Sequence, residues 1–136
     1  MNILFYLTPK NEVMHLFEDY SVRQAIEKME YHKYSAVPII SRSGNYVGTL
    51  TEGDFLWELK RGQAVDIKEI EELKIRPLKR KKDNQPVNVN CNIEDLIMTS
   101  MNQNFVPVID DNGIFIGIVT RKSIIEYCYK RCKSLV

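Results

Sequence analysis

An internal duplication constrains this sequence more than any other feature. When the chain is shifted by 69 residues, residues 35–59 align with residues 104–128 without a gap, and six of the 25 aligned positions are identical. The identical pairs are Val37/Val106, Pro38/Pro107, Ile40/Ile109, Gly44/Gly113, Gly48/Gly117 and Thr51/Thr120. Because the repeated unit is long and occurs only twice, it predicts a duplicated half-domain rather than a solenoid.

The length limits how the two copies are arranged. With 136 residues there is room for one compact domain, and either half alone would bury only a marginal core. We therefore expect half-domains at residues 1–62 and 79–136, joined at residues 63–78 by a linker with a short helix. The formal net charge of +1 gives no whole-chain field that would attract nucleic acid or a membrane.

The cysteines and the opening residues favour a reducing compartment. Cys91, Cys128 and Cys132 form no CxxC pair, and the apolar run at residues 3–7 is too short for a secretory signal. No apolar stretch approaches the length that spans a bilayer. Free thiols in the cytoplasm are the simplest interpretation.

The first repeat predicts the order strand, helix, strand, strand, helix. A strand is expected near residues 13–16, and Ser21-x-x-Gln24 is a capping box that begins a helix. Residues 35–40 and 46–50 are apolar strands around a turn, and Pro38 belongs at an edge, a bulge or an unpaired position. A helix over residues 52–61 ends at Gly62. The side chains expected to face inward are Val22, Ala25, Ile26, Met29, Phe55, Leu56 and Leu59.

The second repeat predicts the same order. A strand is expected at residues 87–89, a helix capped by Asn92-x-x-Asp95, strands at 105–109 and 114–119, and a final helix over residues 121–134. The side chains expected to face inward are Ile93, Leu96, Ile97, Met101, Ile124, Ile125 and Cys128.

Two β-α-β-β-α units, each with Val-Pro in the middle strand and Gly-x-x-Thr-x-x-Asp after the last strand, resemble the cystathionine-β-synthase (CBS) domain. A tandem pair is called a Bateman module, and the resemblance covers nearly the whole chain. It implies an α+β (α/β) fold in which two half-domains pack about a pseudo-twofold axis and leave two equivalent clefts. No catalytic, DNA-binding or transporter domain is expected beside the pair.

The resemblance also implies ligands and partners. Members of the family commonly hold AMP, ADP, ATP, S-adenosylmethionine or cyclic di-AMP in these clefts, as ligands and not as required cofactors. Such pairs often form homodimers, and a partner protein would respond to the bound ligand. The leading hypothesis is therefore a non-catalytic adenine-nucleotide sensor, and the alternative is a nucleotide-free interaction scaffold with vestigial clefts.

Thr51 and Asp54 allow two interpretations. Thr-x-x-Asp at a helix start is itself a capping box and needs no ligand. A helix N-terminus also offers N–H groups to a phosphate, while the Asp54 carboxylate suits the two hydroxyls of a ribose. Gly48 either lets a ligand approach the backbone or marks a bulge. The pattern alone favours capping, the resemblance favours binding, and the two are compatible.

The second copy departs from the family motif. Thr120 is kept, but Ser123 stands where the aspartate is expected, so ribose binding there should be weaker or different. Arg121 either pairs with a phosphate, which its fork matches, or faces solvent. We therefore predict two unequal sites.

A further set of residues matches the family segment that lines the adenine. Phe105 either stacks on a base or packs in the core, and for Val37 and Val106 the core is favoured. The residues that match this segment are Tyr34, Ser35, Ala36, Pro38, Asn104, Phe105 and Pro107.

The remaining features favour structural roles. The basic run Lys79–Lys82 is interpreted first as a solvated loop, next as a polyphosphate-attracting segment, and last as a nucleic-acid site. His15 and His32 have no metal-ligand partners at suitable spacing, and no nucleophile–base pair is visible. We therefore do not expect an enzyme, and Trp57 is assigned to packing or to a dimer interface.

Overall fold

The computed structural model describes residues 2–61 and 66–134, so the predicted helix end at Gly62 lies outside the described residues. The chain divides into two compact units, which are described separately. The first-repeat unit comprises Met14–Asp83, and the second-repeat unit comprises Met1–Val13 together with Asn84–Val136. The first residues of the chain therefore fold with the second repeat.

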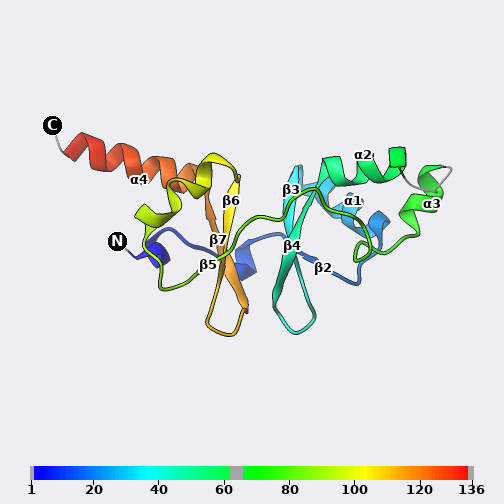
Figure 1. The fold of residues 1–136 in the computed structure, drawn as a ribbon, viewed down its shortest axis with the longest axis horizontal. Helices are drawn as coiled ribbons and strands as arrows, with labels where there is room; N and C mark the ends of the chain where they lie inside the picture. Colours follow the sequence, from blue (N-terminus) through cyan, green and yellow to red (C-terminus); the bar gives the residue numbers. More distant parts are fainter. Residues whose placement is uncertain (1, 62–65, 135–136) are drawn as a thin grey trace. The chain divides into compact units, whose positions relative to one another are not determined.

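The first-repeat unit contains a three-stranded sheet with helices packed against it (Figure 1). The strands lie in the order β2-β3-β4, with β2 parallel to β3 and β4 antiparallel to β3. Helix α1 buries Val22, Ala25 and Met29 in a core shared with the sheet. The elements are β2 (Leu16–Phe17), α1 (Val22–His32), β3 (Ala36–Ile40), β4 (Tyr46–Thr51), α2 (Glu52–Arg61) and α3 (Ile67–Glu71).

The second-repeat unit repeats this plan with one added strand. Its sheet order is β1-β7-β6-β5, in which β5 is parallel to β6 while β1 and β6 are antiparallel to β7. The elements are β1 (Thr8–Pro9), β5 (Val87–Asn88), β6 (Phe105–Ile109), β7 (Phe115–Thr120) and α4 (Arg121–Ser134), with short 3-10 helices at Ile3–Phe5, Lys10–Glu12, Ile93–Leu96 and Thr99–Met101.

The strand register confirms the duplication. Ala36 pairs with Thr51 and Phe105 pairs with Thr120, which are the same partners after the 69-residue shift. The irregularity that follows Ile39 in β3 recurs after Val108 in β6. The turn glycines of both hairpins, Gly44 and Gly113, have positive φ angles of 95° and 79°. The copies therefore share their backbone geometry as well as their sequence pattern.

Two local predictions are confirmed by hydrogen bonds and pairing. Ser21 begins α1 as predicted: its hydroxyl accepts from the Gln24 N–H (3.1 Å), and the Gln24 side chain accepts from the Ser21 N–H (2.8 Å). Pro38 lies outside the stretch that β2 pairs, because β2 reaches only Ile39 and Ile40. Because proline has no backbone N–H, Pro38 could not donate a hydrogen bond to β2, and at this position no such bond is needed.

The predicted buried faces of α2 and α4 are wrong in part. In α2 it is Asp54 that is buried, with Phe55 half-buried, whereas Leu56 is 61% exposed and Leu59 is also exposed. A helix turns about 100° per residue, so a face centred on Asp54 and Phe55 directs Leu56 outward. In α4, Ile124 is buried but Ile125 is exposed for the same reason.

The helix expected after Asn92 is also wrong. This segment forms two short 3-10 helices, in which three residues make a turn. That period keeps Ile93 and Leu96 on the buried side. Ile97 and Met101, which an α-helical period placed inside, are exposed.

Candidate functional site

The junction between β4 and α2 holds the first copy of the motif. The Thr51 N–H donates to Asp54 Oδ2 (2.9 Å), and the Asp54 N–H donates to Thr51 Oγ1 (3.3 Å). This reciprocal pair confirms the capping interpretation. The ligand interpretation of the same two residues stays a prediction.

A segment distant in the sequence covers this junction. The backbone N–H of Lys81 donates to Asp54 Oδ1 (3.1 Å), so both carboxylate oxygens already accept a bond. Only 2% of Asp54 is exposed. We name residues Lys79–Asp83 the strap, because they cross the motif and are bonded to it.

The strap is fixed by a charged pair. Asp83 Oδ1 accepts from the Thr49 N–H (2.9 Å) and from Arg80 Nε (2.7 Å), and Asp83 Oδ2 accepts from Arg80 Nη2 (3.2 Å). The hydrogen bond to Asp83 raises the pKa of Arg80 above its usual value. A Cβ atom at Gly48 would collide with the side chains of Asp83 and Arg80, so a larger residue at this position would displace the charged pair.

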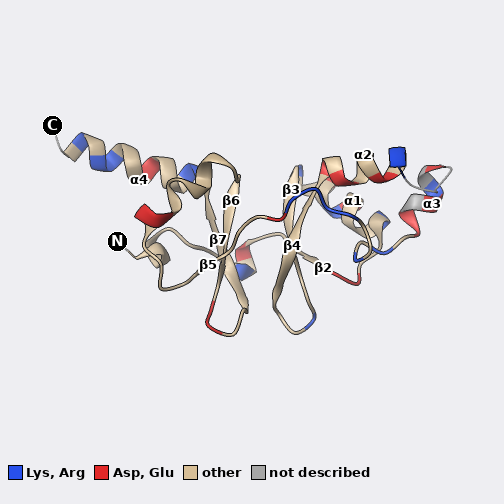
Figure 2. Cartoon of the chain, viewed as in Figure 1, with Lys and Arg blue, Asp and Glu red and all other residues tan. Residues whose placement is uncertain are grey.

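The basic run is therefore not simply a solvated loop. Figure 2 shows it as a continuous blue stretch, and Lys79, Lys81 and Lys82 are exposed. The Arg80 side chain, in contrast, is only 18% exposed and points into the charged pair with Asp83. The solvated-loop interpretation is therefore wrong for Arg80, and the interpretation as a polyphosphate-attracting segment stays a prediction.

The equivalent junction between β7 and α4 is built without a carboxylate. The Ser123 N–H donates to Thr120 Oγ1 (3.1 Å), and the Thr120 hydroxyl donates to Ser123 Oγ (3.0 Å). Arg121 Nε donates to the carbonyl oxygens of Ser100 (2.7 Å) and Gln103 (3.2 Å), which does not fit the solvent-facing alternative. A role of Arg121 toward phosphate stays a prediction.

In each unit, the motif glycine is covered by a segment that precedes the opposite repeat in the sequence. Gly48 lies under the strap, and Gly117 lies under β1, where a Cβ atom would collide with the Thr8 carbonyl oxygen. In β1, Pro9 is paired with Gly117 and Thr8 with Ile118. Both glycines therefore allow another segment to approach the strand closely. At Gly48 the approaching atoms belong to side chains, and at Gly117 they are mainly backbone atoms.

Some of the residues predicted to line the adenine are exposed, whereas others are buried. The ring of Tyr34 is exposed and stacks on His32 at 5.9 Å, and Ser35 and Asn104 are exposed while Ala36 is half-buried. Pro38, Phe105 and Pro107 are buried. The Ser35 carbonyl accepts from the Glu52 N–H (3.0 Å), and the Asn104 carbonyl accepts from the Arg121 N–H (2.9 Å), so each segment contacts the motif helix of its own unit.

Sequence reasoning missed two residues that organise these segments. One is Asp83, and the other is Gln103, which is buried and joins two loops. Gln103 Oε1 accepts from the Gln85 N–H (2.7 Å), and Gln103 Nε2 donates to the Phe105 carbonyl (3.2 Å). Both act across long sequence separations, and only the glycine at position 48 signalled that something approaches β4 closely.

The histidines and cysteines of the described residues show no arrangement typical of a metal centre. Within residues 2–61 and 66–134, no three His, Cys, Asp or Glu side chains gather as metal ligands would. His15 contacts the ring of Phe17, and His32 contacts Tyr31 and Tyr34. Cys91, Cys128 and Cys132 are free thiols. No helix in the described part of the chain is long and apolar enough to cross a membrane.

Solved structures share this fold. A crystal structure of CbpB in complex with c-di-AMP matches with a TM-score of 0.87 and 24% identity, over 99% of this chain and 89% of that chain. A crystal structure of CBSX2 in complex with AMP matches with a TM-score of 0.74 and 22% identity, over 95% of this chain and 96% of that chain. At these identities the likeness establishes the fold.

Sequence comparisons identify the family. L-aspartate semialdehyde sulfurtransferase from Methanocaldococcus jannaschii is 29% identical over 104 residues, which are 76% of this chain but only 19% of that protein's length. The model of the CBS domain matches residues 6–61 and 80–130. Two matches in tandem, together with the duplicated strand register, show that this chain belongs to the CBS-domain family and carries a pair of CBS domains.

Proposed function

We propose that this chain is a non-catalytic regulatory module that binds an adenosyl ligand and signals its presence to a partner protein. The observation that carries the proposal is the intact Thr51–Asp54 motif at the start of α2, in a chain of this family. Thr51 supplies a hydroxyl and Asp54 a carboxylate that accepts from ribose hydroxyls. The sulfurtransferase relative supports no catalytic role here, because the chain matches a fifth of it.

The ligands of two structurally similar proteins and the charged side chains near the motifs favour a nucleotide that contains adenine, ribose and phosphate. CbpB holds c-di-AMP and CBSX2 holds AMP, and both ligands combine adenine, ribose and phosphate. Asp54 is suited to ribose, whereas Arg121 and the strap supply cations for phosphate. We propose c-di-AMP or AMP as the physiological ligand, with the two motif copies contributing unequally.

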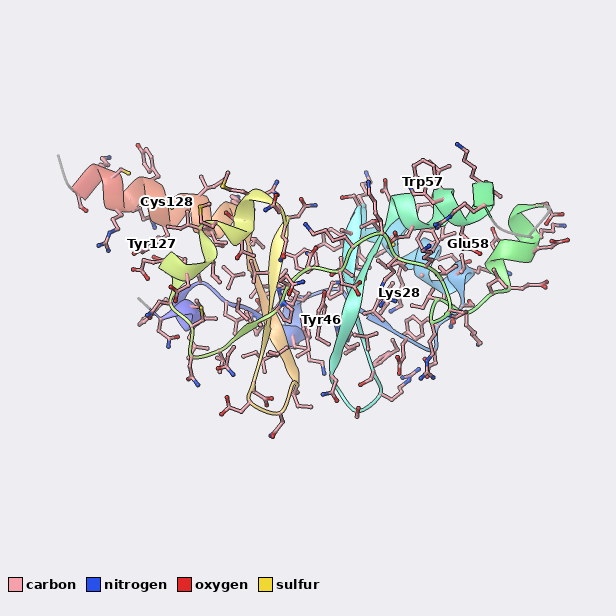
Figure 3. The ribbon with its side chains drawn as sticks, viewed as in Figure 1. Lys28, Tyr46, Trp57, Glu58, Tyr127 and Cys128 are labelled. Carbon is pink, nitrogen blue, oxygen red and sulfur yellow. The ribbon has the colours of Figure 1, made fainter. Side chains whose placement is uncertain are left out.

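We also propose a homodimer, because apolar side chains are exposed on the helices that follow the motifs. In α2, Leu56 and Trp57 are exposed, and Figure 3 shows Trp57 pointing away from the sheet. In α4, Ile125 and Tyr129 are exposed. In the first-repeat unit, a groove of about 560 Å³ between α1 and α2, with Ile26, Met29 and Phe55 in its lining, adds apolar surface. Exposed apolar side chains of this kind, present on each unit, are typical of protein interfaces.

Two observations favour the scaffold as a second candidate. Both oxygens of Asp54 are already bonded within the chain, and Ser123 replaces the second aspartate. A scaffold would keep these bonds permanently and would not respond to nucleotide.

Thermal unfolding with c-di-AMP, AMP, ADP, ATP and S-adenosylmethionine separates the two candidates. A ligand at 100 times its dissociation constant adds about 2.7 kcal/mol to the free energy of unfolding, which raises the melting temperature by several degrees. The proposal predicts such a rise with at least one of these compounds. No rise with any of them would leave the scaffold as the better account.

A further inference from the structure

The carboxylate of Asp83 occupies a position suited to a phosphate group. It accepts from the backbone N–H of Thr49 and from two nitrogens of Arg80, at 2.7–3.2 Å. A backbone N–H combined with an arginine fork is a donor set that proteins use for phosphate oxygens. Gly48 leaves room for such an anion directly against the strand.

The same strap closes the predicted ribose contact. The Lys81 N–H is bonded to Asp54 Oδ1 and the Thr51 N–H to Asp54 Oδ2, and Asp54 is 2% exposed. Ribose hydroxyls reach this carboxylate only after the strap moves. The anion position and the ribose position are therefore closed by one five-residue segment.

Exposure indicates which member of the charged pair a ligand would replace. The Asp83 side chain is 38% exposed, whereas the Arg80 side chain is 18% exposed. A solvated carboxylate exchanges with another anion at low cost, while the more buried guanidinium keeps its place. Arg80 is thus the fixed cation and Asp83 the replaceable anion.

The strap also lies where the chain passes from one unit to the other. Asp83 is bonded to Thr49 in the first-repeat unit, whereas Asn84 Nδ2 donates to the Phe105 carbonyl in the second-repeat unit (3.0 Å). Release of Asp83 therefore frees one end of the connecting segment. Ligand binding would be coupled in this way to the connection between the repeats.

We propose that Asp83 is an internal competitor for the anionic group of the ligand. A phosphate displaces its carboxylate from Arg80 and from the Thr49 N–H, and the released strap uncovers Asp54. The inference deepens the proposed function and rests on it for the adenosyl part of the ligand. The part of the site that recognises phosphate is testable without any nucleoside.

The first test is a nuclear magnetic resonance titration of the ¹⁵N-labelled wild-type chain with inorganic pyrophosphate, AMP, c-di-AMP and adenosine. The Thr49 amide and Arg80 Nε–H signals report the two donors directly. We expect saturable shifts of both signals with the phosphate-bearing compounds and none at Arg80 with adenosine. Unchanged Thr49 and Arg80 signals with pyrophosphate and with a bound nucleotide would overturn the proposal.

The second test compares affinities of variants. Asp83→Asn removes the charge but keeps the shape, so we expect the dissociation constant for AMP or c-di-AMP to fall roughly 3- to 10-fold, and that for adenosine to fall as well because the strap over Asp54 is held less tightly. Arg80→Gln should weaken nucleotide binding and cancel the gain in the double variant. Asp19→Asn is the matched control, because Asp19 forms a similar two-bond pair with Arg42 (2.8 and 2.9 Å) in the same unit. Equal affinities in wild type and Asp83→Asn would contradict competition.

The outcomes separate the two proposals. Pyrophosphate shifts at Thr49 and Arg80, strengthened in Asp83→Asn, with no adenosyl compound bound, would support the anion site and refute the proposed function. A nucleotide that binds wild type and Asp83→Asn equally, with the Arg80 signal unmoved, would do the reverse. The wild-type titration needs no variant, so it stands even if a substitution prevents folding.

Discussion

Asp54 and Ser123 occupy equivalent places at the starts of α2 and α4, but they cap their helices with different chemistry. Asp54 accepts two backbone bonds through a charged, buried carboxylate, whereas Ser123 shares a neutral bond with Thr120. Hydrogen bonds to charged groups are about twice as strong as neutral ones. The first repeat therefore depends more on its capping residue than the second.

Replacing the two residues tests this asymmetry. Asp54→Ala should lower the free energy of unfolding by roughly 2 kcal/mol, the upper end for a lost cap, because the Lys81 N–H also loses its acceptor. Ser123→Ala should cost roughly 0.5–1 kcal/mol. Urea unfolding of both variants measures the difference, and equal losses would show that the strap bond adds nothing.

The motif glycines differ from a third glycine nearby. The Cβ atom of an alanine at position 117 would collide with the backbone of Thr8 and Pro9, which cannot move without breaking the β1–β7 pairing. Gly117→Ala should therefore lower the free energy of unfolding by about 1–3 kcal/mol. Gly53 lies in α2 with its nearest neighbour at 3.7 Å from a built Cβ atom, so Gly53→Ala should stabilise the helix by up to about 1 kcal/mol. Measuring the melting temperatures of the Gly117→Ala and Gly53→Ala variants against wild type tests both expectations. A loss at Gly53 similar to that at Gly117 would contradict the steric account.

Glu94 connects the 3-10 segment to α4. Its carboxylate accepts a short hydrogen bond from the Tyr127 hydroxyl, which lowers the pKa of Glu94 from 4.5 to about 2, and Arg131 Nη1 donates to the same hydroxyl (3.1 Å). Because the folded-state pKa is depressed, the bond stabilises the fold above pH 4.5, and this contribution is lost as the pH falls from 4.5 through about 2.

Tyr127→Phe isolates this effect. The melting temperature of the variant should lie below that of wild type at neutral pH, and the gap should close as the pH falls toward 2. Tyr129→Phe, on an exposed position of the same helix, is the control and should show no gap at either pH. A gap that persists unchanged to low pH would mean that Tyr127 acts through packing alone.

At the scale of elements, α2 buries one face and leaves apolar side chains exposed on the other, which we propose as a dimer interface. Asp54 and Phe55 fix it to its own unit, and Leu56 and Trp57 are left exposed. Leu56→Glu combined with Trp57→Ala should therefore shift the chain from dimer to monomer in analytical ultracentrifugation, with little change in stability. Lys68→Glu in α3 is an exposed control that should leave the mass unchanged. A wild-type monomer would remove the dimer from the account.

The elements themselves were largely predictable, because local signals define them. Helix α1 follows from a capping box, and the β3–β4 and β6–β7 hairpins follow from β-branched strands around a glycine turn. The exposed face of α2 was not predictable, since apolar periodicity alone does not show whether an apolar side chain is buried in the core or exposed. The strap was hidden for another reason: Asp83 meets Thr49 across 34 residues, and no local pattern encodes that bond.

At the scale of the whole chain, the duplication leaves two motif copies that are not equivalent. Two copies of one fold share register and turns, although the side chains of their motifs differ. The first copy keeps the carboxylate of Asp54, and the second combines Ser123 with Arg121. We therefore expect the first motif to contact the ribose of a ligand and the second motif to contact its phosphate.

Calorimetric titration of the purified chain with c-di-AMP and with AMP tests the central claim most directly. The account predicts saturable binding of at least one of them, with a dissociation constant raised at least 10-fold by Asp54→Asn and left unchanged by Asp19→Asn, which alters an exposed ion pair elsewhere in the same unit. Absence of binding by wild type, or binding that Asp54→Asn leaves unchanged, would contradict the assignment of the Thr51–Asp54 motif to an adenosyl ligand.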